Sequence, residues 1–119
     1  MGWKIAGAGL GLLLILGACE DGTPEQNIAS VRAKNPVSDQ LKTTSELYRY
    51  LGLRRGIIDN NQPCKRADRG AYQQEYKTMA MWVVHCIDSG DWAVFIAPNG
   101  DVQARKCSDA AVLGIPACR

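Results

Sequence analysis

Two turns of the same design divide residues 78–107 into three short, largely apolar segments, and this stretch constrains the fold more than any other. Each turn has Gly at its third position, in Asp-Ser-Gly at 88–90 and in Pro-Asn-Gly at 98–100. A type I turn followed by a left-handed residue favours Gly at that place, because a Cβ atom strains the conformation. We therefore expect three antiparallel strands joined by two three-residue turns, a β-meander.

The hydrophobic pattern selects a register for this meander. Three-residue turns place Ile87 opposite Asp91 and Ala97 opposite Asp101, and one face of the sheet then becomes almost wholly apolar. A two-residue Asn-Gly turn in the second hairpin would instead set apolar side chains against polar ones, since a one-residue slip turns them to the other face. The opposite face is apolar on the first two strands alone, which predicts a partial cover there. The expected rows across the meander are Cys86–Trp92–Lys106, Val84–Val94–Ala104 and Trp82–Ile96–Val102.

A single helix from about Asp39 to Leu51 is expected to cover the apolar face. Residues 43–46 (Thr-Thr-Ser-Glu) have the pattern of a capping box, and Gly52 is placed to end the helix. Its apolar stripe consists of Leu41, Leu47, Tyr48 and Leu51.

Residues 53–76 are expected to form a polar connector rich in turns, and a short helical turn is expected at 109–113, ended by Gly114. The sequence thus predicts a small α+β domain over residues 38–119. In it a three-stranded antiparallel β-meander packs against one helix, and disulfides stabilise the whole.

The first 18 residues have the properties of an export signal. A short basic start is followed by an apolar stretch at residues 5–16, which is too short to cross a membrane. Next come Leu16, Gly17, Ala18 and Cys19, with an aliphatic residue three places before the cysteine and small residues between. This segment resembles the lipobox of bacterial lipoproteins, over residues 1–19 only. The resemblance implies that residues 1–18 are removed and that Cys19 carries the lipid.

The resemblance also implies where the chain is located and that a tether joins the lipid to the domain. A lipidated Cys19 would hold the chain in the bacterial cell envelope, facing the periplasm, because two acyl chains bind a bilayer firmly. Residues 19–37 would then be a tether with a possible short helix that begins near Thr23 and Pro24. The plain alternatives are a secretory signal without lipid or an uncleaved anchor.

The cysteine count agrees with a lipidated Cys19. The chain has five cysteines, and using one for lipid leaves Cys64, Cys86, Cys107 and Cys118 to pair in an oxidising compartment. A Cys86–Cys107 bond is disfavoured, because the outer strands of a meander lie about 10 Å apart. The pairs Cys64–Cys86 and Cys107–Cys118 are preferred over Cys64–Cys107 with Cys86–Cys118.

The motifs of the common catalytic and cofactor sites do not occur in the sequence. His85, the single histidine, neighbours Cys86 but points to the other face of a strand, so the two cannot act together as a nucleophile and base. There is no Cys-x-x-Cys pair, no Gly-rich phosphate loop and no serine elbow. We expect no cofactor, no metal site and no catalytic residues.

Basic residues concentrate in one part of an otherwise balanced chain. After Cys19 the chain carries 13 basic and 12 acidic residues, whereas residues 49–77 carry seven basic and three acidic ones. A basic surface with nearby tyrosines can contact lipid headgroups, an anionic polymer or an acidic protein. The plain alternative is a solvated loop of mixed charge. The candidate contact surface consists of Arg54, Arg55, Lys65, Arg66 and Arg69.

These features predict a class of function and no specific task. We expect an envelope lipoprotein, attached to the membrane by its lipid, that acts as a non-enzymatic binding or accessory subunit of a larger assembly. A protein partner in the envelope is expected, and nucleic acid is not, because the chain is exported. The alternative is a small envelope enzyme or an enzyme inhibitor with its site in residues 54–76.

Overall fold

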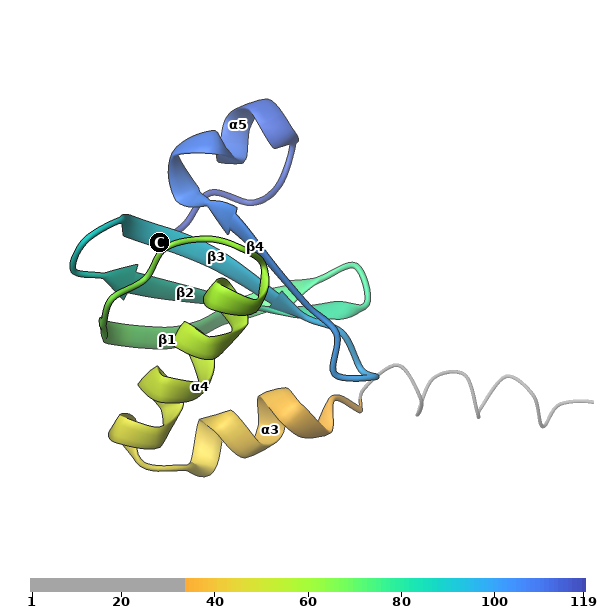
Figure 1. Ribbon diagram of the computed structural model, residues 1–119. Coiled ribbons are helices and arrows are strands. Elements are labelled where there is room, and N and C mark those ends of the chain that lie inside the picture. The colour runs from red at the N-terminus through yellow and green to blue at the C-terminus, as the bar shows by residue number, and fades with distance from the viewer. Residues whose placement is uncertain (1–33) are drawn as a thin grey trace, which may run out of the picture. The chain divides into compact units, whose positions relative to one another are not determined.

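A four-stranded antiparallel sheet with the strand order β1-β2-β3-β4 forms the centre of the domain (Figure 1). The computed structural model describes residues 34–119, and residues 35–119 form a compact unit. The expected signal peptide (1–18), Cys19 and the tether as far as residue 33 lie outside the described residues. The elements are α3 (Pro36–Thr43), α4 (Glu46–Asp59), β1 (Ala67–Tyr76), β2 (Met79–Cys86), β3 (Gly90–Ile96), β4 (Val102–Lys106), the 3-10 turn η2 (Cys107–Asp109) and α5 (Ala110–Leu113).

The α+β class is confirmed, but the expected number of strands is wrong. The three predicted strands are β2, β3 and β4, and the second hairpin has the expected register, with Ile96 opposite Val102. Its turn closes through Ala97, whose N–H donates to the Asp101 carbonyl, and Gly100 has a φ of 96°. The additional strand, β1, pairs with the outer edge of β2.

The first hairpin differs from the expected register by two residues. Cys86 lies opposite Gly90, and Val84 lies opposite Trp92. The turn contacts the connector, because the Asp88 carboxylate accepts a hydrogen bond from the Lys65 backbone N–H at 2.8 Å. A two-residue shift keeps every side chain on its own face. The hydrophobic pattern therefore could not distinguish the two registers.

Strand β1 lies in the segment that was expected to be a polar connector rich in turns. The pairing with β2 shifts between Ala67 and Arg69 and again between Tyr72 and Gln74, so the strand contains two irregularities. Its core-facing positions therefore do not follow the period of two that a regular strand would show.

The expected single helix is two helices, which is a second correction. The break falls at Thr44 and Ser45, where the Ser45 side chain accepts from the Tyr48 N–H and begins α4. The capping signal thus starts a second helix instead of the first. Gly52 does not end α4, which continues to Asp59.

Helix α4 covers the apolar face of the sheet, as expected, but with different side chains. Its Leu53 and Ile57 are buried against the sheet, whereas Leu47, Tyr48 and Leu51 of the predicted stripe are exposed. Gly56 allows close packing, since a Cβ there would lie 3.0 Å from Val102 Cγ1. The buried sheet residues of this core are Ala67, Ala80, Trp82, Val84, Cys86, Trp92, Val94, Ile96 and Ala104.

The opposite face, here called the reverse face, carries the partial cover that the sequence predicted. The C-terminal segment after β4 turns back over it, with α5 on the side away from α3 and α4 (Figure 1). Ile115 and Cys118 pack against buried Met81 and Phe95. Gly114 ends α5 in a left-handed conformation with a φ of 72°.

Candidate functional site

The four cysteines of the domain form two disulfides. Cys64 pairs with Cys86, and Cys107 pairs with Cys118, which are the pairs preferred from the sequence. The first bond joins the segment after α4 to the end of β2. The second closes the C-terminal segment that covers part of the reverse face.

The five basic residues of the expected contact surface do not form one surface. Arg54 makes hydrogen bonds within the domain, since its Nε donates to the carbonyls of Cys64 and Lys65 at 2.8 and 3.1 Å. Arg55 pairs with Asp59 on the same helix at 3.1 Å. Lys65 and Arg66 are exposed beside α4, while Arg69 lies on β1 and faces the other side of the sheet.

Three of these basic residues surround an exposed apolar group on α4. Leu47, Tyr48 and Leu51 have exposed fractions of 63%, 66% and 49%. A hollow of about 210 Å³ is lined by Leu47 and Leu51 together with the basic side chains, while Tyr48 lies next to it on the same helix. We call this surface the α4 patch, and it consists of Leu47, Tyr48, Leu51, Arg54, Lys65 and Arg66.

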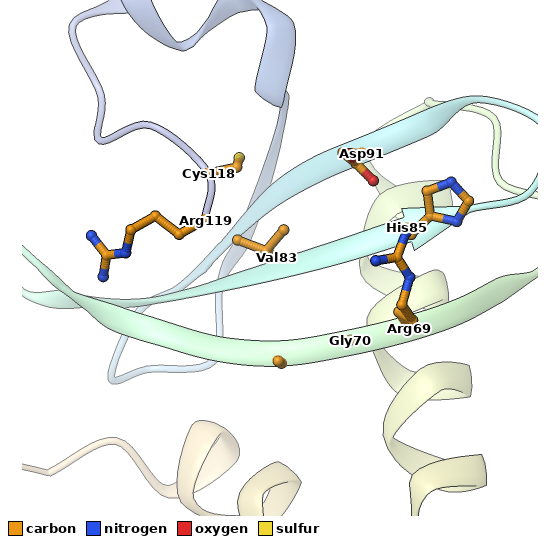
Figure 2. A pocket seen from close by; sticks show the side chains of 8 residues that line it. Arg69, Gly70, Val83, His85, Asp91, Cys118 and Arg119 are labelled. Atoms are coloured by element: carbon orange, nitrogen blue, oxygen red, sulfur yellow. The ribbon is translucent and has the colours of Figure 1, made fainter.

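A second hollow, of about 230 Å³, lies on the reverse face (Figure 2). Three charged or titratable residues lie side by side at one end of this hollow. Strand pairing places Arg69 of β1 opposite His85 of β2, and His85 opposite Asp91 of β3. We call it the reverse-face hollow, and its lining residues are Arg69, Gly70, Ala71, Val83, His85, Asp91, Cys118 and Arg119.

The C-terminal segment supplies the far wall of the reverse-face hollow. Gln73 holds it in place, since its Nε2 donates to the Ala117 carbonyl at 2.9 Å and its Oε1 accepts from the Arg119 N–H at 2.7 Å. The disulfide of Cys118 fixes the same segment to the end of β4. The wall is thus attached to both edges of the sheet, to β1 through Gln73 and to the end of β4 through the disulfide.

His85 is oriented by a carboxylate. Its Nδ1 lies 2.6 Å from Asp68 Oδ1, and a carboxylate can only accept, so Nδ1 carries the proton. The hydrogen bond from His85 lowers the pKa of Asp68 against the opposing effect of desolvation, and the nearby Arg69 charge adds to the lowering. Cys86 points away into the core, as expected, and its sulfur is bonded to Cys64.

The reverse-face hollow has groups for binding charge and no hydroxyl or free thiol in its lining. No serine or threonine lines it, and its one cysteine, Cys118, is in a disulfide. A His–carboxylate pair activates a hydroxyl or thiol only when one lies within hydrogen-bond reach. The lining offers two guanidinium groups, those of Arg69 and Arg119, with a carboxylate and an imidazole over an apolar floor.

Searches for metal and membrane-spanning features gave no candidates in residues 34–119. This part of the chain contains no group of three or more His, Cys, Asp or Glu residues arranged to hold a metal ion. Within the same range no helix has the length and apolar character needed to cross a membrane.

Two features of the site were not anticipated from the sequence. Asp91 and Arg119 were not singled out, because they join Arg69 and His85 only through strand pairing and the return of the C-terminal segment. The exposure of Leu47 and Leu51 was missed because they were assigned to the buried stripe.

Comparison with known proteins supplies no relative for this chain. Protein-family models, curated protein sequences and solved structures were all compared with it, and nothing matches.

Proposed function

We propose that this chain is a lipid-anchored protein of the bacterial cell envelope. Its domain would act there as a non-enzymatic binding or accessory subunit of a larger assembly. The Leu-Gly-Ala-Cys segment at 16–19 supports the anchor. The pairing of the other four cysteines supports export, since disulfides persist in oxidising compartments such as the periplasm. The domain faces the periplasm and remains at the membrane through the acyl chains of Cys19.

The observation that carries the binding role is the α4 patch. A helix in a small domain normally buries its large apolar residues, yet α4 exposes Leu47, Tyr48 and Leu51 together over one and a half turns. Contiguous apolar groups on a surface mark contact sites, and Tyr and Arg are the residue types that contribute most to protein interfaces. The α4 patch is therefore assigned to a protein partner.

The charges around the α4 patch indicate what kind of partner fits. The side chains of Lys65 and Arg66 take part in no hydrogen bond or ion pair among residues 34–119, so both are available to a partner. An envelope protein with an apolar ridge and neighbouring carboxylates would match both parts of the patch.

The alternative of an enzymatic or inhibitory site within residues 54–76 has less support. This segment is divided between the end of α4, the connector and β1. Its charged side chains do not gather in one place: Arg66 lies at the α4 patch, Arg69 lines the reverse-face hollow, and Arg55 pairs with Asp59 on α4. The segment thus offers no single surface.

Site-directed photocrosslinking in a bacterial host tests the binding role. A photoreactive phenylalanine analogue in place of Tyr48 or Leu51 should give one discrete protein adduct. The matched control carries the analogue in place of Val112, an apolar residue of α5 that is 89% exposed, and it should give none. Lys65→Glu with Arg66→Glu should reduce the Tyr48 adduct at least several-fold, whereas Arg105→Glu should not.

Three results would contradict this assignment. Adducts with lipid alone at Tyr48 would indicate that the α4 patch lies on the membrane. Equal adducts at Tyr48 and Val112 would indicate random encounters. A Lys65→Glu, Arg66→Glu variant that retained the full adduct would remove the charge argument.

The anchor has a separate test. Cys19→Ser should abolish incorporation of a fatty-acid analogue and leave the signal peptide attached, because lipidation precedes cleavage in lipoprotein export. Mass spectrometry of the purified chain measures both effects. A Ser variant that still incorporated the label would contradict the proposed anchor without affecting the crosslinking result.

A further inference from the structure

The reverse-face hollow holds opposite charges that the fold leaves unused. In the part of the chain that the structure describes, the side chains of Arg69, Asp91 and Arg119 take part in no hydrogen bond or ion pair. Arg69 and Asp91 flank His85 on neighbouring strands, yet they do not pair with each other. A guanidinium and a carboxylate thus face one hollow across a gap.

The gap has a defined width and an apolar floor. Arg69 and Asp91 are two strands apart, so their Cα atoms are separated by about 10 Å. Figure 2 shows the Arg69 guanidinium, which reaches up from β1, and the Asp91 carboxylate, on β3, on the same side of the His85 ring. Ala71 and Val83, the next row along the sheet, line the hollow between this end and the C-terminal segment.

We propose that the reverse-face hollow binds a small zwitterion of the dipeptide class. Its carboxylate would accept two hydrogen bonds from the Arg69 guanidinium, whose fork matches the two oxygens. Its ammonium group would lie at the Asp91 carboxylate, and a small aliphatic side chain would rest on Val83 and Ala71. His85, fixed by Asp68, would border the middle of the ligand.

Size and charge separation both favour a dipeptide. A hollow of about 230 Å³ lies below the range of about 300–1,000 Å³ that is usual for drug-sized ligands. Two residues of extended chain span about 7 Å, so a dipeptide fits within the about 10 Å between the backbones that carry Arg69 and Asp91. A single α-amino acid carries its two charges on one Cα and separates them less than a dipeptide does.

This site is independent of the proposed protein contact. The α4 patch belongs to the helical side of the sheet, whereas the hollow lies on the reverse face between β1, β2, β3 and the C-terminal segment. The two surfaces can therefore be occupied together, and the binding of a dipeptide does not require the lipid anchor or the partner to exist.

Calorimetric titration of the purified, oxidised full chain with alanyl-alanine tests the proposal. Saturable binding with one site is expected. Acetylation of the ligand's amino group, amidation of its carboxylate, or replacement by alanine should each weaken binding about tenfold or more, because each removes a charge-assisted contact.

Variants assign the two ends of the ligand. Arg69→Gln should weaken binding of alanyl-alanine about tenfold or more and have little effect on the amidated peptide. Asp91→Asn should do the same for alanyl-alanine and have little effect on the acetylated peptide. Both residues are exposed, so the variants should fold, and unchanged thermal unfolding checks this. Arg105→Gln, an exposed cation on β4 that lines neither hollow, is the matched control and should bind like the wild type.

Clear results would overturn the proposal. The proposal fails if alanyl-alanine shows no saturable binding at millimolar concentration, if alanine binds equally well, or if Arg69→Gln and Arg105→Gln lose equal affinity. Loss of discrimination between free and blocked ligands in the wild type would also overturn it. None of these results depends on lipidation or on crosslinking, so failure here is distinguishable from failure of the proposed function.

Discussion

Gly70 of β1 lies directly under α4, and its replacement tests the packing of helix on sheet. A Cβ atom at this position would lie 2.6 Å from Leu53 Cδ1 and 3.4 Å from Tyr50 Cδ1. The first distance is about 1 Å shorter than an ordinary carbon–carbon contact. Leu53 is 1% exposed and packed on every side, so it cannot move away freely. Gly70→Ala must therefore displace α4 or force Leu53 from its rotamer.

The cost can be estimated from overpacking in other cores. Inserting a methyl group into a well-packed site costs about 1–3 kcal/mol. Ala also restricts the unfolded chain, which returns about 0.4–1 kcal/mol. We expect Gly70→Ala to lower the free energy of unfolding by about 1–2 kcal/mol. For a domain of this size, that corresponds to a fall in Tm of about 4–16 °C.

Thermal unfolding followed by circular dichroism measures the effect, and Gly52→Ala is the matched control. Gly52 lies in α4 with room for a methyl group, since its Cβ would be 3.4 Å from Leu41 Cδ2. Ala there should raise stability by about 0.5–1 kcal/mol. Leu53→Ala combined with Gly70→Ala should cost less than the sum of the two single changes, because the added methyl group occupies part of the cavity. A Gly70→Ala variant as stable as the wild type would refute the reasoning.

Three further results are expected. Ser38→Ala should lower the free energy of unfolding by about 1–3 kcal/mol in a urea titration. The reason is that the buried indole N–H of Trp82 donates to the Ser38 hydroxyl and would lose its acceptor. Tyr72 should titrate last among the tyrosines in an ultraviolet pH titration, because burial, followed by the hydrogen bond to Glu75, raises its pKa from 10.0 to about 12. Its contribution to stability is present below pH 10 and is lost as the pH rises through 12. The His85→Ala change should raise the pKa of Asp68, as seen by NMR. This lowering of the Asp68 pKa stabilises the wild-type fold above pH 3.8. The stabilisation is lost as the pH falls through the lowered pKa of the folded state.

The parts of the fold that depend on one local rule could be predicted from the sequence. The turn at 98–100 needs a residue with positive φ at its third position, and Gly100 supplies it, so the β3–β4 register follows. The alternation of Trp82, Val84 and Cys86 identifies the core face of β2, and all three are buried. The order of the strands argues against a Cys86–Cys107 bond, and the preferred of the two remaining sets of pairs is the one observed.

Other parts depend on contacts between distant segments, and no local pattern contains them. The first hairpin's register depends on Asp88 meeting the backbone of Lys65, which lies 23 residues away. The buried residues of α4 are Leu53 and Ile57, which were assigned to the connector because Gly52 suggested an end to the helix.

The candidate sites also depend on contacts between distant segments, so the sequence did not show which residues lie together. Each basic residue could be seen in the sequence, but its surface depends on the element that carries it. Arg66 precedes β1 and lies at the α4 patch, whereas Arg69 follows the irregularity between Ala67 and Arg69 and lines the reverse-face hollow. The partners of Arg69 come from β2, β3 and the C-terminal segment, and only the sheet brings them together.

The Cys64–Cys86 bond also affects how the domain behaves when its backbone is cut. Lys65 and Arg66 are exposed and follow Cys64 directly, so the bond between them is a candidate cut for a trypsin-like protease. The fragment before the cut contains both α3 and α4 and still carries Cys64, which is bonded to β2 in the other fragment. A nicked domain therefore keeps its helices attached to its sheet. Separation of the two fragments requires a reductant as well as a protease.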